Sequence, residues 1–252
     1  PGKYARGLAA AAERAGASLV DYTRVAGIRA DVSGFRIATN RGELRADAVL
    51  VATNGYSRGP DGQSAMPWLA RRMIPVASYI IATEELPAET MDRLFPGRRM
   101  ISDTKRVLNY FRPAPNGNRI LWGGRARFGP NAPEAAAPRL HSVMTAVFPE
   151  LSKVKITHAW TGNVAFTFDF LPHIGVQDGI HYAAGCQGSG VAMATWLGHN
   201  AALKIAGAAN QRFALDGLEF PTVALYNGNP NWFLPIIGGW YRLRDRIDRI
   251  AA

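Results

Sequence analysis

The stretch that decides the fold is YAAGCQGSGVAMATWLGHNAALKIAG, residues 182–207. A short, mostly apolar run over residues 180–184 precedes three glycines, Gly185, Gly188 and Gly190. In the longer run that follows, apolar residues recur at Val191, Ala194, Leu197, Ala201, Ala202 and Ile205. Apolar residues spaced three and four apart are typical of one face of a helix. The stretch therefore predicts a strand, a tight glycine turn and a buried helix.

Glycines at the start of a helix allow two interpretations. The first turn of a helix has backbone N–H groups without intrahelical partners and carries a positive charge of about half an elementary charge. Glycines there let an anion or a polar ring approach these N–H groups, because no Cβ stands in the way. The other interpretation is that the glycines only permit close packing of strand and helix, since a lone Gly-x-x-Gly-x-Gly is a weak signal.

The first part of the chain has the pattern of a mixed α/β domain. Helical spacing predicts a helix over residues 3–15 that ends at Gly16, and residues 17–22 have the pattern of a short strand. Short strands follow, with turns at Ser33-Gly34 and at residues 40–42. The apolar run 48–52 suits a strand covered on both faces. It ends in Thr53-Asn54-Gly55, where a backbone can approach a ligand closely.

From Ser57 the pattern changes to that of an antiparallel sheet. A loop rich in Gly and Pro precedes strand-like segments at residues 73–86, 106–128 and 153–162, and residues 137–151 have helical spacing. We therefore expect part of one domain over 1–56, an antiparallel-sheet domain over 57–159, a return to the first domain over 160–207, and a C-terminal tail over 208–252.

The composition bounds the class of protein. The chain has 252 residues, 48% hydrophobic and 19% charged, enough for one large domain or two interleaved ones. No apolar run reaches the roughly 20 residues that a membrane-spanning helix needs, so we expect no transmembrane segment. The single cysteine, Cys186, excludes an internal disulfide, and we expect a cytoplasmic protein. The chain starts at Pro1 without a leader pattern, so we expect the inside of a longer gene product.

The net charge is +10, and 24 of the 29 basic residues are arginines. An excess of positive charge of this size is typical of proteins that bind nucleic acid, a membrane surface or anionic substrates. The arginines are scattered singly except in WYRLRDRIDRI, residues 240–250, so the clustered basic and aromatic pattern of a nucleic-acid-binding protein is lacking and we expect no such partner. The five histidines are also scattered, and we expect no metal site.

Seven stretches, taken together and in order, resemble one family. They are residues 1–25, 46–57 (ADAVLVATNGYS), 74–86, 102–125, 148–151, 158–175 (HAWTGNVAFTFDFLPHIG) and 185–190. The chain resembles the FAD-dependent D-amino-acid oxidase superfamily, and within it the gamma-glutamylputrescine oxidase-like branch beside the glycine and sarcosine oxidases. The tail WYRLRDRID, residues 240–248, also resembles that branch.

The resemblance implies an α/β (α+β) fold. A doubly wound FAD-binding domain, lacking its N-terminal βαβ, would comprise residues 1–56 and 160–207, with an inserted antiparallel-sheet substrate domain over 57–159. The FAD would be non-covalent, because the cysteine that attaches flavin in some sarcosine-oxidase relatives is absent from residues 158–162. The implied cofactor-binding residues are the backbone of Val25 at the adenine, Thr53, Asn54 and Gly55 near the phosphate–ribityl portion, Gly162, and, at the flavin ring, Gly185, Gln187, Gly188, Ser189, Gly190 and Val191.

Two departures from the family pattern set further expectations. The family's Gly-x-Gly-x-x-Gly seat for the FAD pyrophosphate is absent, so we expect FAD binding by this chain alone to be weak or lost. Either a separate N-terminal FAD-binding segment on another polypeptide is the partner that completes the site, or that segment was removed, or the chain is a truncated remnant.

The second departure concerns the arginine that holds the substrate carboxylate in the amino-acid oxidases. It corresponds to Val164, which cannot pair with a carboxylate, so an amine or an N-substituted amino acid fits better than a small free amino acid. Arg112 and Arg72 are the alternative carboxylate partners, unless they are ordinary surface residues.

The sequence thus predicts an FAD-dependent oxidoreductase, or its C-terminal portion, that oxidises the C–N bond of an amine or N-substituted amino acid by hydride transfer to flavin. Such chemistry depends on positioning and on the electrostatics of the flavin site, so we assign no catalytic acid or base. Tyr79, Tyr110 and Trp160 are candidate walls of the substrate pocket, or else ordinary sheet-core aromatics. The alternative function is a truncated, non-catalytic domain without cofactor that acts as an interaction partner. The tail, residues 229–248, suits packing on the body or at a subunit contact better than a membrane-surface segment.

Overall fold

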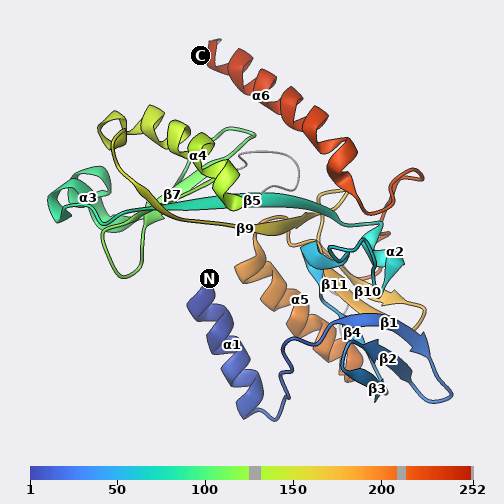
Figure 1. Cartoon of the computed structure of the whole chain (residues 1–252). Coiled ribbons are helices and arrows are strands. Elements are labelled where there is room, and N and C mark those ends of the chain that lie inside the picture. The colour runs from blue at the N-terminus through green and yellow to red at the C-terminus, as the bar shows by residue number, and fades with distance from the viewer. Residues whose placement is uncertain (125–131, 209–213, 251–252) are drawn as a thin grey trace. The chain divides into compact units, whose positions relative to one another are not determined.

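A computed structural model describes residues 1–124, 132–208 and 214–250 (Figure 1). The chain divides into two compact units, each made of two segments. Unit 1 comprises Pro1–Pro75 and Val164–Asn229, and unit 2 comprises Val76–Asn163 and Pro230–Ala252. This division is one of compactness, and the functional domain boundaries expected from the sequence stay a prediction.

Unit 1 begins with a helix and a small antiparallel sheet. Helix α1 spans Gly2–Arg14, and Gly16 just beyond it has φ of +95°, the left-handed conformation that commonly ends a helix. The sheet has the strand order β1-β2-β3. Its strands are β1 (Val25–Ala30), β2 (Phe35–Thr39) and β3 (Gly42–Ala46). The helix, these strands and the two turns between them confirm the prediction from residues 1–46 except for the strand expected over 17–22.

A second sheet, of order β10-β11-β4, holds the stretch that decides the fold. Its strands are β4 (Leu50–Val51), β10 (His173–Gln177) and β11 (Ile180–Ala184). Strand β11 pairs in parallel with β4 and antiparallel with β10. Helix α5 (Gly190–Ile205) follows β11 and packs on this sheet through Leu197 and Ala201. The predicted order of strand, glycine turn and helix is therefore confirmed.

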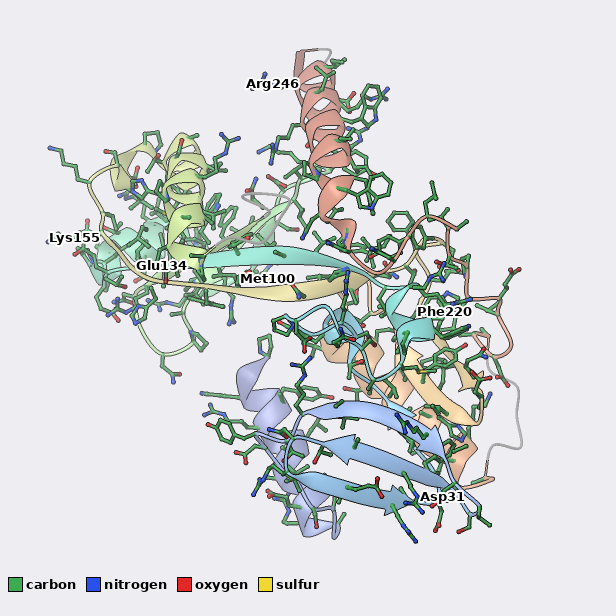
Figure 2. All side chains as sticks on the ribbon, turned by 45° about the vertical axis from the view of Figure 1, so that its right-hand side comes forward. Asp31, Met100, Glu134, Lys155, Phe220 and Arg246 are labelled. Atoms are coloured by element: carbon green, nitrogen blue, oxygen red, sulfur yellow. The ribbon has the colours of Figure 1, made fainter. Side chains whose placement is uncertain are left out.

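A separate cluster of buried side chains in unit 1 surrounds Tyr182 of β11. Phe220, labelled in Figure 2, belongs to it, and Trp68 packs against both rings at centroid distances of 5.1 and 5.8 Å. The other buried members are Val51, Met66, Leu69, Met73, Ala165 and Ala184. Two short helical segments lie in this part of the chain, η1 (Asn54–Tyr56) and α2 (Pro67–Ala70).

Two expectations for unit 1 are wrong. Residues 17–22 form no strand: they belong to none of the sheets in the described part of the chain, and Leu19, Val20 and Tyr22 are exposed. Helix α5 is not buried. Only Leu197 and Ala201 are buried, since the described residues cover this helix only on the side of the three-stranded sheet.

Unit 2 is built on a five-stranded sheet of order β6-β7-β8-β5-β9 in the described part of the chain. Strand pairs β6–β7, β7–β8 and β8–β5 are antiparallel, which confirms the sheet type predicted from Ser57 onward. The strands are β5 (Ile74–Thr83), β6 (Ile101–Ser102), β7 (Asn109–Pro113), β8 (Ile120–Gly124) and β9 (Ile156–Phe166). Residues 125–128 of the expected middle segment lie outside the described residues.

Helices α3 (Ala88–Leu94) and α4 (Pro133–Val147) supply side chains to one core on this sheet, together with η3 (Pro149–Leu151). Phe111 and Trp122 stack at its centre with ring centroids 4.2 Å apart, and Tyr79, Leu140 and Met144 are buried beside them. The remaining short segment is η2 (Pro96–Arg98). Apolar side chains from every second strand residue thus meet the helices, as the strand period requires.

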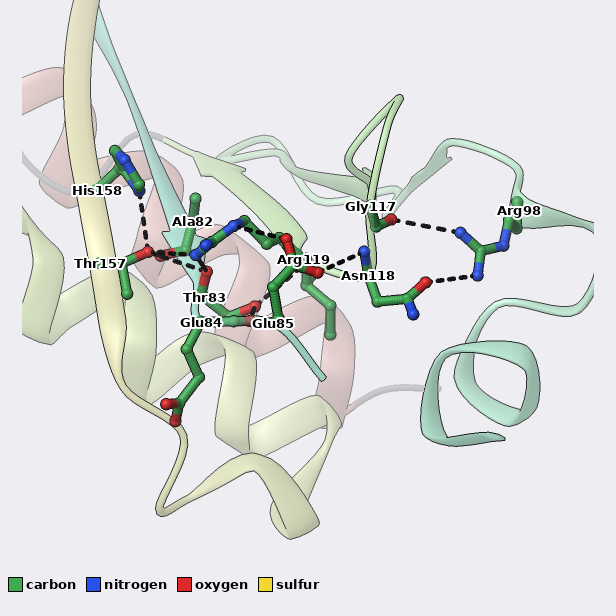
Figure 3. A network of polar contacts seen from close by, with 11 residues as sticks. Ala82, Thr83, Glu84, Glu85, Arg98, Gly117, Asn118, Arg119, Thr157 and His158 are labelled. Carbon is green, nitrogen blue, oxygen red and sulfur yellow. Dashed lines mark hydrogen bonds and ion pairs between the residues drawn. The ribbon is translucent and has the colours of Figure 1, made fainter. Parts of the chain in front are cut away.

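Arg119, at the start of β8, joins three strands at one end of this sheet (Figure 3). Its guanidinium donates to the carbonyl of Thr83 at 2.8 Å and to the hydroxyl of Thr157 at 2.9 Å, and it pairs with Glu85 at 3.0 Å. The hydroxyl of the fully buried Thr83 accepts the backbone N–H of Ile120 at 3.0 Å. These contacts hold β5, β8 and β9 in one register.

The tail forms η4 (Pro230–Trp232) and helix α6 (Leu234–Ile250), which belongs to unit 2. The Asp245 carboxylate accepts the backbone N–H groups of Arg106 and Val107 at 3.0 and 3.1 Å. The prediction that the tail packs back on the body therefore agrees with the structure. In the described part of the chain, no helix is long and apolar enough to span a membrane.

Candidate functional site

The turn between β11 and α5 carries the three glycines, and their structural need for glycine differs. Gly185 has φ of +81°, and a Cβ there would lie 2.7 Å from Cγ2 of Thr167, so both conformation and packing require glycine. Gly188 has φ of +92°, but a Cβ there would only make an ordinary contact with Val164 Cγ1, at 3.8 Å, so conformation alone favours glycine. Gly190 needs neither, because its φ is ordinary and a Cβ would meet only Cys186 Sγ, at 3.5 Å. The packing interpretation therefore accounts for Gly185 and leaves Gly190 unexplained.

The N-terminus of α5 keeps its hydrogen-bond donors open. The helix begins at Gly190 after Ser189, whose side chain makes no capping hydrogen bond. The backbone N–H of Met193 bonds to the Ser189 carbonyl at 2.9 Å, so the N–H groups of the first three helical residues have no partner within the helix. Gly188, Ser189 and Val191 are exposed. This end of the helix can therefore receive an electron-rich group.

Asn54 fixes the turn from the end of β4. Its side-chain oxygen accepts the N–H of Gly185 at 3.0 Å, and its amide nitrogen lies 3.2 Å from Sγ of the buried Cys186. Asn54 has φ of +47°, in the left-handed region that asparagine tolerates better than most residues. Thr53 bonds to the Ser57 hydroxyl at 2.9 Å, and Gly55 is buried. The structure thus brings the ATNG motif and the glycine turn together.

Gln187 leaves a buried acceptor open in the same turn. Its amide nitrogen donates to the Thr167 hydroxyl at 2.7 Å, and its backbone adopts φ of +52°. Its side-chain oxygen is buried and has no hydrogen-bond partner among the described residues. Buried acceptors are normally paired, so this oxygen fits a donor from a ligand, such as an N–H of a flavin ring.

Val164 lies beside this turn. Its Cγ1 atom is 3.8 Å from the position that a Cβ on Gly188 would take. A longer side chain at position 164 would therefore start next to the glycine turn. Val25, in contrast, begins β1 and is exposed.

The candidate substrate residues of unit 2 do not share one face of the sheet. Tyr79 pairs with Gly124 and Tyr110 with Gly123, and neighbouring strand residues point to opposite faces. Tyr79 is buried in the helix-covered core, which is the sheet-core placement. Tyr110 lies on the other face, where its hydroxyl bonds to that of Ser78 and its ring covers Gly123.

Trp160 and Gly162 both lie on β9 within unit 2. Trp160 is exposed and Gly162 is half-buried. Neither belongs to the core of buried side chains in that unit.

The two arginines considered as carboxylate partners have different surroundings. Arg72 donates to the carbonyls of Phe220 and Trp68 at 2.8 and 3.0 Å, lies over the Trp68 ring at 3.7 Å, and has its pKa lowered by burial. It therefore holds the chain of unit 1 together. Arg112, two residues after Tyr110, is half-buried on the same face of the sheet. It makes no ion pair with any carboxylate in the described part of the chain, so its charge stays available.

The residues that position the turn were not predicted. Thr167 is fully buried, donates to the Leu171 carbonyl at 2.9 Å and accepts from Gln187. The His173 ring, also buried, bonds to the Asp169 carboxylate at 2.9 Å and stacks on Phe220 at 3.9 Å. The Asp–His pair at i and i+4 in DFLPH was the available signal. Within the described ranges no cluster of three His, Cys, Asp or Glu side chains could hold a metal ion.

A cavity of about 410 Å³ lies elsewhere in unit 1, lined by Arg58, Arg71 and Tyr226 among others. None of the predicted site residues lines it. The guanidiniums of Arg58 and Arg71 donate to the carbonyls of Gly62 and Tyr226, at 2.8 and 3.2 Å. This cavity is therefore distinct from the glycine turn.

Comparison with known proteins places the chain in a family. Residues 1–203 match the family model described as FAD dependent oxidoreductase. The chain is 31% identical over 248 residues to a probable oxidoreductase OrdL of Rhizobium meliloti, covering 98% of this chain and 56% of the relative. It is 30% identical over 216 residues to the gamma-glutamylputrescine oxidoreductase of Escherichia coli, covering 84% of this chain and 49% of that relative. The chain thus spans about half the length of the curated relatives it matches.

Solved structures show the same fold at low identity. The crystal structure of glycine oxidase from Geobacillus kaustophilus superposes with a TM-score of 0.67 at 23% identity, covering 87% of this chain and 57% of that one. The crystal structure of L-proline dehydrogenase from P. horikoshii superposes with a TM-score of 0.63 at 24% identity, covering 84% of this chain and 56% of that one. The mixed α/β fold expected from the sequence is thereby confirmed, and the chain belongs to the FAD-dependent oxidoreductase family.

Proposed function

We propose that this chain forms part of an FAD-dependent oxidoreductase that oxidises the C–N bond of an amine or an N-substituted amino acid. In this chemistry a hydride leaves the substrate carbon next to nitrogen for the flavin, and water hydrolyses the resulting imine. The observation that carries the proposal is the turn before α5, where open N–H groups, an unpartnered Gln187 oxygen and a sterically unneeded Gly190 coincide.

The chain's own residues would hold and orient the flavin ring. The N–H groups of Gly190 and Val191 and the positive end of the α5 dipole stabilise negative charge, which increases on the ring as it is reduced. Asn54 keeps the turn in place through Gly185, and Gln187 offers its oxygen to a ring N–H. Thr53, Gly55 and Ser189 stay candidate contacts, as do Val25, Gly188 and Gly162.

The substrate class follows from Val164 and from the sheet of unit 2. A valine beside Gly188 cannot bind a carboxylate, which disfavours small free amino acids. Tyr110 and Arg112, on the face of the sheet opposite the helix-covered core, are the better candidates for substrate contact. Trp160 stays a candidate wall, whereas Tyr79 is a core residue by its burial. A gamma-glutamyl amine, as named for the relative from Escherichia coli, has the amine and the carboxylate that such residues would recognise.

A second polypeptide segment would complete the FAD site. No side chain of α1 is buried, α5 buries two, and Leu19, Val20 and Tyr22 are exposed. Exposed apolar groups gathered in this way mark a surface that another segment covers. We propose that this segment carries the Gly-x-Gly-x-x-Gly seat, that FAD binds only weakly without it, and that the complete flavoprotein is cytoplasmic.

The test is the visible absorbance of the purified chain after incubation with excess FAD and gel filtration, alone and with a polypeptide that carries the motif. Flavin bands that co-elute under either condition, with flavin fluorescence quenched, support the proposal. If the chain stays colourless and unquenched under both conditions, while the full-length relative from Rhizobium meliloti retains FAD in parallel, the proposal fails. The non-catalytic interaction domain then remains the function.

A further inference from the structure

Helix α6 has one face held by the body of unit 2. Leu234 and Gly238 are buried, and Asp245 is bonded to the backbone at Arg106 and Val107. The Arg106 guanidinium also pairs with both Asp245 and Asp248. These contacts orient the helix, and its acidic side chains are already compensated.

The opposite face of α6 is an exposed apolar stripe. The stripe residues are Ile236, Trp240, Leu243 and Ile247, and they are 72%, 56%, 49% and 50% exposed. Their spacing of four, three and four residues places them on one line along the helix. Trp232, just before the helix, is 62% exposed. A stripe this continuous on a helix whose other face is fixed marks an interaction surface.

Arginines flank the stripe on both sides. At about 100° per residue, Arg244 and Arg246 project to opposite sides of its centre line. Both are exposed, Arg246 is labelled in Figure 2, and neither pairs with a carboxylate in the described part of the chain. The Arg244 guanidinium lies 5.9 Å from the Trp240 ring centroid. An apolar line with tryptophan, bordered by cations, is the arrangement of helices that lie in a bilayer interface.

We propose that α6 docks on the surface of an anionic lipid bilayer, with the stripe residues in the headgroup boundary and Arg244 and Arg246 on lipid phosphates. The arginines beside the stripe favour an anionic bilayer over a second copy of the chain as the binding partner. Two stripes facing each other would bring four arginines together, and the nearest acidic side chains are engaged by Arg106. Anionic headgroups supply the missing counter-charge, and the net charge of +10 favours the same surface.

The test is flotation of the chain with phosphatidylcholine vesicles, with and without about 30% phosphatidylglycerol. We expect co-flotation only with the anionic vesicles. Arg244→Gln with Arg246→Gln should weaken binding about 25-fold, roughly fivefold for each arginine. The matched control is Arg6→Gln with Arg14→Gln on the exposed surface of α1, which changes the net charge equally and should bind like wild type apart from a small general loss.

The contribution of the apolar stripe to vesicle binding is tested by a second double variant with its own control. Trp240→Ser with Leu243→Ser should abolish flotation, whereas Leu225→Ser with Val32→Ser, at even more exposed positions, should not. All these side chains are exposed, so circular dichroism and the melting temperature should stay unchanged, which separates lost binding from lost folding. Absence of wild-type flotation, or equal flotation of the stripe variant and its control, overturns the proposal. So does a dimer that the stripe substitutions dissociate, because the occupant is then a second copy.

Discussion

The side-chain oxygen of Asn54 accepts the backbone N–H of Gly185 at 3.0 Å, across 131 positions of sequence. This bond joins the loop after β4 to the turn before α5, and both adjacent strands belong to one parallel pair. The turn that would face a flavin is therefore held by a residue of the ATNG motif rather than by its own glycines.

Substitution of Asn54 should weaken both the fold and flavin binding. Asn54→Ala leaves the Gly185 N–H without its acceptor, at a cost of about 1–3 kcal/mol in the free energy of unfolding. Asn54→Asp keeps the acceptor and loses only the contact with Cys186, so it should retain most of the stability. Urea unfolding and FAD titration measure the two effects. Asn40→Ala, which removes an exposed acceptor of the Arg24 N–H, should leave FAD affinity unchanged; an equal loss there would argue against a specific role for Asn54.

Gly190→Ala should change stability and flavin binding in opposite directions. The site has room for a Cβ and an ordinary φ, so the chain should gain up to about 1 kcal/mol from reduced unfolded-state freedom. A methyl group at the helix N-terminus should nevertheless lower FAD affinity on the order of tenfold, because it blocks close approach. Gly198→Ala, in the middle of α5 with nothing near its Cβ, should stabilise without that loss. Equal FAD affinity of the two variants would show that no ligand approaches Gly190.

Val164→Arg tests the substrate class in a flavin-loaded preparation. Its guanidinium would start beside Gly188 and could bind a carboxylate by two hydrogen bonds. We expect kcat/KM for small free amino acids to rise relative to amines on the order of tenfold or more. Val164→Met, similar in length but uncharged, should not shift the ratio. An unchanged substrate profile in the arginine variant would mean that position 164 does not correspond to the family's arginine.

Arg112 and Arg72 should separate into a substrate-binding and a structural residue. Arg112→Gln should leave the free energy of unfolding within about 0.5 kcal/mol and raise KM for carboxylate-bearing amines on the order of tenfold. Arg72→Gln should lower stability by about 2 kcal/mol or more, because it loses bonds to two carbonyls and the contact with Trp68. Steady-state kinetics and thermal unfolding of both variants are the measurements. The reverse pattern, with KM raised by the Arg72 change alone, would exchange the two assignments.

The Asp169–His173 contact predicts an acid limb in the stability profile. Burial alone would raise the pKa of Asp169, but hydrogen bonds from the His173 ring, the Leu171 N–H and Thr167 hold it below its usual 3.8. The folded state then binds fewer protons than the unfolded state in acid. The stabilisation is full above the unfolded pKa of about 3.9 and is lost as the pH falls through the lower folded value. Asp169→Asn should flatten that part of the curve, measured by urea unfolding from mildly acidic to strongly acidic pH. Parallel curves for the two proteins would contradict it.

Local pattern was sufficient for most of the elements. Gly16, Gly34, Gly185 and Gly188 mark turns whose conformations only glycine adopts easily, so these boundaries could be read directly. Residues 17–22 show the limit of such patterns. Their composition suits a strand, but a strand also needs a neighbour, and pairing is a property of the whole sheet. The exposure of α5 has the same cause, since apolar spacing states which face can be covered and not whether anything covers it.

The sequence was sufficient to predict the type of site, but not the contacts that hold its residues in place. The motif containing Asn54 could be assigned to the cofactor, but its bond to Gly185 depends on β4 and β11 being neighbours. Tyr79 and Tyr110 both looked like pocket aromatics, because a sequence does not state which face of a sheet meets the helices. Thr167 gave no signal at all, since a single buried threonine is common and its role comes from two partners, Leu171 and Gln187, that folding brings to it.

The Arg119 contacts at the end of the unit 2 sheet have a consequence for specificity. Neighbouring residues of a strand point to opposite faces. A slip of one position between β5 and β8 would therefore turn Tyr79 out of the core and bring Ser78 or Ile80 into its place, depending on the direction of the slip. By bonding to both Thr83 and Thr157, Arg119 opposes that slip. A relative could therefore acquire a new substrate range through a change at this anchor, and a comparison restricted to pocket residues would overlook the cause.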